Sequence, residues 1–161
     1  MTYPEPRYFG DDGEMSAYFR PVSAPPDLTY PSGVAVDYLA TGATTNGQFG
    51  LYQWNTSGVR SGPEPHFHRT ISESFYILSG TIRIYNGAKW VDHEPGDFVH
   101  VPEGGIHGFR NESGEPASML LMFHPGAPRE DYFEGLLTLG EKTDEERKAF
   151  FALHDNFWIE E

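Results

Sequence analysis

The chain has 161 residues, about the size of one ordinary domain, and its 24 acidic and 11 basic residues give a formal charge of −13. Such an acidic surface repels nucleic acids and anionic membranes, so neither is an expected partner. No cysteine is present, which excludes disulfides, thiolate metal sites and cysteine nucleophiles. Long apolar runs and a secretory signal are also missing, so we expect no transmembrane segment and a cytoplasmic location.

Residues 1–31 are rich in proline and aromatic side chains and show little periodicity. Proline removes a backbone donor and restricts the backbone, which disfavours a regular helix. We therefore expect an extended arm whose aromatic side chains pack on the chain's own barrel or on a neighbouring subunit; a loose tail is the alternative.

Short runs typical of β-strands follow the arm, and hairpin signals such as Ser79-Gly80 and Asn86-Gly87 separate them. Aromatic residues make up 15% of the chain and favour strands. The expected strands are Val34–Ala40, Gln48–Trp54, Glu73–Ser79, Thr81–Tyr85, Lys89–Asp92, Asp97–Val101, Ile106–Arg110 and Ala117–Phe123. Many short strands with close turns predict an all-β sandwich or barrel.

The last part of the chain changes to a helical pattern. Apolar residues in Asp131–Leu139 recur at helical spacing. Thr143 and Glu146 have the spacing of a capping box ahead of a second helix, Asp144–His154. We expect these helices to close one end or one face of the barrel.

A set of histidines and one glutamate carries the chemistry. His66 and His68 leave the same face of a strand, because side chains alternate with a period of two. Glu73 begins an otherwise apolar strand, which is unusual unless a cation compensates its charge. The odd spacing requires a bend in residues 69–72, and His107 can come alongside from an adjacent strand. Three imidazole nitrogens and one carboxylate would suit Fe, Mn, Ni, Co, Cu or Zn.

The remaining histidines have weaker signals. His93 lies beside acidic residues in an expected turn, and His154 lies in the expected last helix. His100 alternates with Phe98 and could face the interior, although a packed histidine is the simpler interpretation. His124 ends a strand and could lie near the rim of the barrel.

Apolar side chains extend the faces that carry the metal-ligand candidates. Phe75 and Ile77 share the face of Glu73, and Phe109 shares the face of His107. These residues could form an apolar chamber around a metal, or they could fill the core that a small barrel requires. Both interpretations can hold at different depths of the barrel.

The spacing of these residues resembles the two motifs of the cupin family. The first segment has His66-Phe67-His68, four residues, Glu73, six residues and Gly80; the second has Gly96, five residues, Pro102-Glu103-Gly104, two residues, His107, three residues and Asn111. One position departs from the pattern, because Arg60 stands where the first motif opens with glycine. Gly58 and Gly62 flank it, so the loop could be shifted.

The resemblance implies a double-stranded β-helix, or jelly-roll, barrel, to which the residue pattern adds an extended N-terminal arm and short C-terminal helices. It further implies a single divalent metal held by His66, His68, Glu73 and His107 in the mouth of the barrel, and a structural role for Asn111. The expected divisions are residues 1–31 for the arm, 32–126 for the barrel and 127–161 for a C-terminal helical segment that packs on the barrel.

Among cupins, the chain resembles small quercetinase-like (quercetin 2,3-dioxygenase-like) proteins. The resemblance implies a metal-dependent dioxygenase that acts on a flavonol-like or other enolic aromatic molecule. Glu73 would serve as both ligand and catalytic base, while Phe75, Ile77 and Phe109 would contact the substrate. The expected partners are an apolar or aromatic small molecule, O₂ and a second copy of the chain in a homodimer.

Two other functions are open on the same residues. A metal-dependent isomerase, cyclase or lyase would use the same Lewis-acid site without O₂. A non-catalytic cupin would bind a small molecule such as a sugar, although such proteins often lose metal ligands and this chain retains all four.

Overall fold

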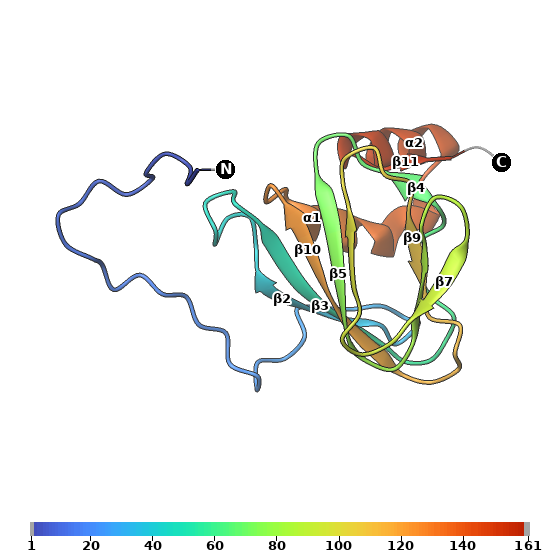
Figure 1. Cartoon of the computed structure of the whole chain (residues 1–161). Helices are drawn as coiled ribbons and strands as arrows, with labels where there is room; N and C mark the ends of the chain where they lie inside the picture. The colour runs from blue at the N-terminus through green and yellow to red at the C-terminus, as the bar shows by residue number, and fades with distance from the viewer. Residues whose placement is uncertain (1, 160–161) are drawn as a thin grey trace.

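The computed structural model describes residues 2–159 as an antiparallel β barrel with an extended N-terminal arm and helices at its C-terminal end (Figure 1). Its largest sheet has six strands in the order β1-β2-β3-β10-β5-β8. A three-stranded sheet, β7-β6-β9, and a two-stranded sheet, β11-β4, complete the sheet structure. The strands are β1 Leu28–Thr29, β2 Ala35–Ala40, β3 Gly50–Thr56, β4 His66–Phe67, β5 Ser72–Ser79, β6 Ile82–Tyr85, β7 Trp90–His93, β8 Phe98–Val101, β9 Gly108–Arg110, β10 Ala117–His124 and β11 Phe157–Trp158.

The core follows the alternation of the long strands. In β3 and β10 every second side chain is buried, and the register places Met119 opposite Trp54 and Leu121 opposite Tyr52. On the other side of β10, Leu121 pairs with Phe75 of β5. The eight predicted strands all correspond to observed ones, with ends that differ by at most two residues. The two-residue strands β1, β4 and β11 are too short to show a period.

The C-terminal helices pack on this core at one end of the barrel (Figure 1). Helix α1, Arg129–Gly135, continues into the 3₁₀ helix η1, Leu136–Glu141, where one α-helix was expected. Helix α2 runs Asp144–Leu153 and has the predicted capping box. The Phe133 ring lies 5.2 Å from the rings of both Tyr52 and Trp54.

Residues 2–27 of the arm contain no helix or strand, and the arm runs away from the barrel (Figure 1). Arg20 anchors its end through Nη2, which lies 2.6 Å from Asp27 Oδ2 and 3.4 Å from Asp37 Oδ1. The predicted division into residues 1–31, 32–126 and 127–161 stays a prediction. Strand pairing crosses both boundaries, because β1 pairs with β2 and β11 pairs with β4. Among residues 2–159 no helix combines the length and apolar character needed to cross a membrane.

Asn111 links the end of β3 to the loop between β9 and β10. It is fully buried, and its Nδ2 donates to Thr56 Oγ1 at 2.7 Å and to the Glu115 carbonyl at 2.8 Å. Its Oδ1 accepts the Ser113 amide at 3.0 Å. The side chain lies away from the histidine cluster, so these bonds support the expected structural role.

The glycine that the first motif lacks at position 60 has a counterpart at position 62. Gly62 has φ +130°, and a Cβ there would lie 1.9 Å from the Phe109 carbonyl oxygen. Arg60 is exposed instead, with Nε 2.9 Å from Glu112 Oε1. The close approach of the loop to β9 therefore requires glycine two positions after the expected one.

We expect Gly62→Ala to lower the free energy of unfolding by about 2 kcal/mol or more, because the loop must retreat from β9 and adopt a strained backbone. Urea denaturation measures this change. Gly140→Ala is the control, since a Cβ there meets nothing within 4 Å; its effect should stay within about 0.5 kcal/mol. Equal stability of the two variants would contradict the assignment of Gly62.

Candidate metal centre

Four side chains from separate parts of the chain converge inside the barrel. His66, His68, Glu73 and His107 are all buried, and one potential ligand atom from each lies within 4.8 Å of the others. The backbone brings them together, because His66 N donates to the His107 carbonyl at 2.7 Å and His107 N donates to the His66 carbonyl at 2.8 Å. Glu73 is the second residue of β5, and its carboxylate contacts His107 of this bridge. The predicted set of three histidines and one glutamate therefore forms one cluster.

Each of the three imidazoles is oriented by a backbone carbonyl at Nδ1. The carbonyls belong to Glu64 for His66 at 2.9 Å, to Asp155 for His68 at 2.6 Å and to Gly105 for His107 at 2.9 Å. A proton on Nδ1 donates to such a carbonyl and leaves the lone pair on Nε2. Carbonyl partners of this kind commonly fix the tautomer of metal-binding histidines. A ring held in this way is a neutral nitrogen ligand whenever its Nε2 carries no proton.

The carboxylate of Glu73 faces two of these rings. Its Oε2 lies 2.8 Å from His107 Nε2 and 3.3 Å from His68 Nε2. An ionised carboxylate only accepts hydrogen bonds, so each contact requires a proton on Nε2. A divalent cation would satisfy the same nitrogen and oxygen lone pairs. The donor set therefore fits a borderline transition metal, although the donors do not distinguish one such metal from another.

The electrostatics also favour a cation. Burial by itself raises the pKa of Glu73, but hydrogen bonds from His107 and His68 hold that pKa well below its ordinary value. Burial, together with His107, lowers the pKa of His66 to about 3. Burial likewise opposes charge on His107, but Glu73 raises the pKa of His107 above its ordinary value. The cluster thus combines an anionic carboxylate with at least one neutral imidazole.

Asp155 fixes the bend that the spacing between His68 and Glu73 requires. Its carboxylate accepts the Arg69 amide at 3.0 Å, the Thr70 amide at 2.8 Å and the Thr70 hydroxyl at 2.7 Å. Burial raises the pKa of Asp155, but these bonds outweigh burial and lower it. The same residue orients His68 through its carbonyl. Sequence reasoning missed Asp155; the only signal was the need for a bend with no local side chain to hold it.

The other histidines do not join the cluster in the described part of the chain. His100 is exposed and contacts Ser74 Oγ at 2.9 Å, and His124 is also exposed. His93 is half-buried, with Nδ1 3.0 Å from the Val91 carbonyl. The half-buried ring of His154 packs against Phe150 at 4.6 Å.

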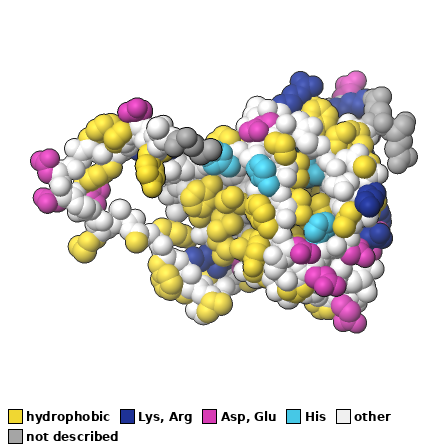
Figure 2. Space-filling model, viewed as in Figure 1, with side chains coloured by type: hydrophobic (Ala, Val, Ile, Leu, Met, Phe, Trp, Pro, Cys, Tyr) yellow, Lys and Arg dark blue, Asp and Glu magenta, His cyan; other side chains and the backbone are white. Residues whose placement is uncertain are grey.

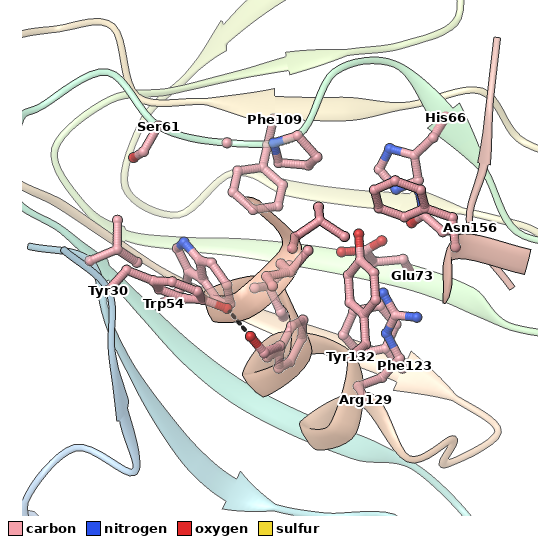
Figure 3. Close-up of a pocket in the computed structure, with 18 of the residues that line it drawn as sticks. Tyr30, Trp54, Ser61, His66, Glu73, Phe109, Phe123, Arg129, Tyr132 and Asn156 are labelled. Carbon is pink, nitrogen blue, oxygen red and sulfur yellow. Dashed lines mark hydrogen bonds between the residues drawn. The ribbon is translucent and has the colours of Figure 1, made fainter. Parts of the chain in front are cut away.

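A cavity of about 360 Å³ lies between the barrel and the C-terminal segment and reaches His66 and Glu73 (Figure 3). Eight of its 20 lining residues are aromatic: Tyr30, Trp54, Phe109, Phe123, Tyr132, Phe133, Phe151 and Trp158. Phe109 lines the cavity as expected. Phe75 and Ile77 are buried in the core and are not among the lining residues, and the Phe75 ring lies 6.1 Å from that of His107.

Comparison with known sequences supports the site. Residues 57–123 match the cupin domain family. Over 48 residues the chain is 35% identical to quercetin 2,3-dioxygenase from Bacillus subtilis (strain 168), which is 30% of this chain but 14% of that enzyme. It is 27% identical over 73 residues to an uncharacterized protein from Aquifex aeolicus (strain VF5), covering 45% of this chain and 60% of that one. The chain therefore spans only part of both relatives.

Solved structures agree on the fold. KdgF from Halomonas sp. has a TM-score of 0.60 at 16% identity, with 71% of this chain and 97% of that one covered. A predicted oxalate decarboxylase from Thermotoga maritima has a TM-score of 0.58 at 20% identity, with 68% and 99% covered. The motif residues thus gather around one buried centre, residues 57–123 are similar to the cupin domain family, and the structural matches show the double-stranded β-helix fold.

Proposed function

We propose that this cupin is a metal-dependent dioxygenase that acts on a flavonol-like or other enolic aromatic molecule. The observation that carries this proposal is the aromatic-rich cavity of about 360 Å³ that has His66 and Glu73 of the buried cluster at its wall. Aromatic walls bind planar rings and exclude water from the reacting end of a ligand. The short similarity to the Bacillus dioxygenase supports the same reaction class.

Four residues would bind the metal, and one of them would also act as the base. His66, His68 and His107 would hold the metal through Nε2, and Glu73 through a carboxylate oxygen. A bound divalent metal (Fe, Mn, Ni, Co, Cu or Zn) would supply Lewis-acid polarisation of a substrate oxygen. Glu73 lines the cavity, and its carboxylate would take the proton of an enolic hydroxyl bound there. This second role makes Glu73 the proposed catalytic base.

Polar atoms at the wall of the cavity support a hydroxylated aromatic ligand. Trp54 Nε1 and Ser61 Oγ are buried, line the cavity and have no hydrogen-bond partner among the described residues. Buried donors normally have partners, and a missing partner costs stability. Hydroxyl groups on a bound ring would satisfy both atoms. Phe109 would contact the ring directly; for Phe75 and Ile77, substrate contact stays a prediction.

We further propose that the chain forms a homodimer in which the arm of one copy covers the outer sheet face of the other. β8 is an edge strand of the six-stranded sheet, and Phe98 on it is 61% exposed. Tyr76 and Met122 are also exposed on this face, and Figure 2 shows hydrophobic side chains gathered there. An exposed edge and apolar patch favour association. The expected cytoplasmic location stays a prediction.

The proposed activity is tested with protein reconstituted with each candidate metal and assayed for O₂ consumption with quercetin and simpler enolic aromatics. We expect one bound metal per chain and turnover with at least one metal. Glu73→Gln should lower turnover by about 100-fold or more, because a general base is lost. His100→Gln should leave turnover unchanged, since His100 is exposed outside the cluster.

Other outcomes of that experiment separate the alternatives. Turnover that persists under strict anaerobiosis would contradict the dioxygenase proposal and indicate an isomerase, cyclase or lyase. Ligand binding without turnover under any condition would indicate a non-catalytic small-molecule or sugar-binding cupin.

Asp155→Ala should weaken metal binding by about 10- to 100-fold, because the bend that carries His68 toward Glu73 loses its carboxylate acceptor. Competition with a coloured chelator measures the affinity. Asp11→Ala removes the same charge from the exposed arm and should leave the affinity unchanged. Equal affinities of the two variants would show that the bend does not depend on Asp155.

Light scattering coupled to gel filtration tests the dimer. Phe98→Asp should convert the dimer to a monomer, because a carboxylate would be buried against the arm. Val59→Asp is the control, since Val59 is 58% exposed in a different loop. A monomeric wild-type chain would overturn this part of the proposal.

A further inference from the structure

Arg129 is a buried arginine without a carboxylate partner. Arg129 is the first residue of α1 and is 4% exposed. Nη1 donates to the His154 carbonyl at 2.8 Å, whereas Nε has no partner. Among residues 2–159 it forms no ion pair. An unpaired buried charge is costly, and one carbonyl does not neutralise it.

Aromatic rings hold the Arg129 guanidinium in place. Its Cζ lies 4.2 Å from the Tyr132 ring centre and 4.9 Å from that of Phe123. These contacts favour a cation but leave its hydrogen-bonding edge unmatched. Burial lowers the pKa of Arg129, yet an arginine stays charged in proteins. The fold therefore maintains a fixed positive charge here.

This charge borders the cavity that reaches Glu73, as does a second unsatisfied side chain. Asn156 is 2% exposed, lines the same cavity, and neither its Oδ1 nor its Nδ2 has a partner in the described chain. Figure 3 shows Arg129, Tyr132 and Asn156 at the Glu73 end of the cavity, away from Trp54 and Tyr30. Two buried polar side chains with unsatisfied atoms, Arg129 at Nε and Asn156 at Oδ1 and Nδ2, thus line the same end of the cavity.

Glu73 does not serve as the missing anion. Its Oε2 is hydrogen-bonded to His68 and His107. Glu73 acts on Arg129 through a longer-range electrostatic interaction and not through a hydrogen bond. A divalent cation held by the cluster would use that carboxylate and add further positive charge beside Arg129. The buried groups would then carry an excess of positive charge that only an incoming anion could balance.

We propose that Arg129 and Asn156 form a subsite for a carboxylate of the substrate, so that the cavity selects aromatic carboxylates over neutral aromatics. The guanidinium would pair with the carboxylate through its free N–H groups, and the Asn156 amide would donate one further bond. The aromatic body would extend toward Trp54. This inference deepens the proposed function, because it names the substrate class of that same cavity.

The test compares binding of cinnamate and of its neutral amide, cinnamamide, to protein stripped of metal, by isothermal titration calorimetry. Without metal, the carboxylate cannot bind a metal ion instead of Arg129. We expect cinnamate to bind about tenfold tighter than cinnamamide, as a charge-assisted pair requires. Because binding to the metal-free protein involves no turnover, the result is independent of whether the chain is a dioxygenase.

Variants test whether Arg129 causes the preference for cinnamate over cinnamamide. Arg129→Met should abolish the preference for cinnamate and leave cinnamamide binding unchanged, whereas Arg129→Lys should retain part of it. Arg7→Met removes a positive charge from the exposed arm and should change neither affinity. If Arg129→Met does not fold, Asn156→Asp should weaken cinnamate binding selectively by about tenfold through charge repulsion.

Two results would overturn the proposal. One is a wild-type chain that binds both compounds equally or binds neither. The other is a preference for cinnamate that survives in folded Arg129→Met, or in Asn156→Asp where that variant replaces it.

Discussion

The buried carboxylate of Glu73 is the constraint around which the site is organised. A carboxylate that is 4% exposed must be compensated, and in this barrel the compensation comes from imidazoles on neighbouring segments. Their positions follow from backbone pairing, since the two hydrogen bonds between His66 and His107 fix both segments beside β5. The geometry of the candidate metal centre is therefore part of the sheet structure itself.

The barrel alone does not complete this site. The carbonyl that orients His68 and the carboxylate that holds the preceding bend both belong to Asp155, which follows α2. Arg129 donates to the His154 carbonyl next to it, so α1 and the end of α2 are joined beside the cluster. Loss of the C-terminal segment would thus affect the orientation of a metal ligand as well as the wall of the cavity.

The sequence predicts the parts of the site that depend on local periodicity. Alternation places His66 and His68 on one face, and the cupin spacing adds Glu73 and His107. The sequence cannot predict the role of Asp155, because the amides that it accepts lie more than 80 positions earlier and leave no local pattern. The same holds for Arg129, whose burial depends on how α1 packs. Phe75 shares the face of Glu73 as predicted, but that face turns into the core below the cavity.

The barrel holds the cluster, whereas the C-terminal segment supplies much of the cavity wall, and this difference bears on ligand specificity. The cluster depends on strands whose register a single residue shift would destroy, so it has little freedom to change. The cavity wall, in contrast, takes Arg129, Tyr132, Leu136 and Asn156 from helices and loops outside the sheets. Substitutions there change the charge and shape that a ligand meets and leave the ladder bonds of the barrel intact. Under the proposed function, ligand preference can therefore change through the C-terminal segment, while the candidate metal centre stays the same.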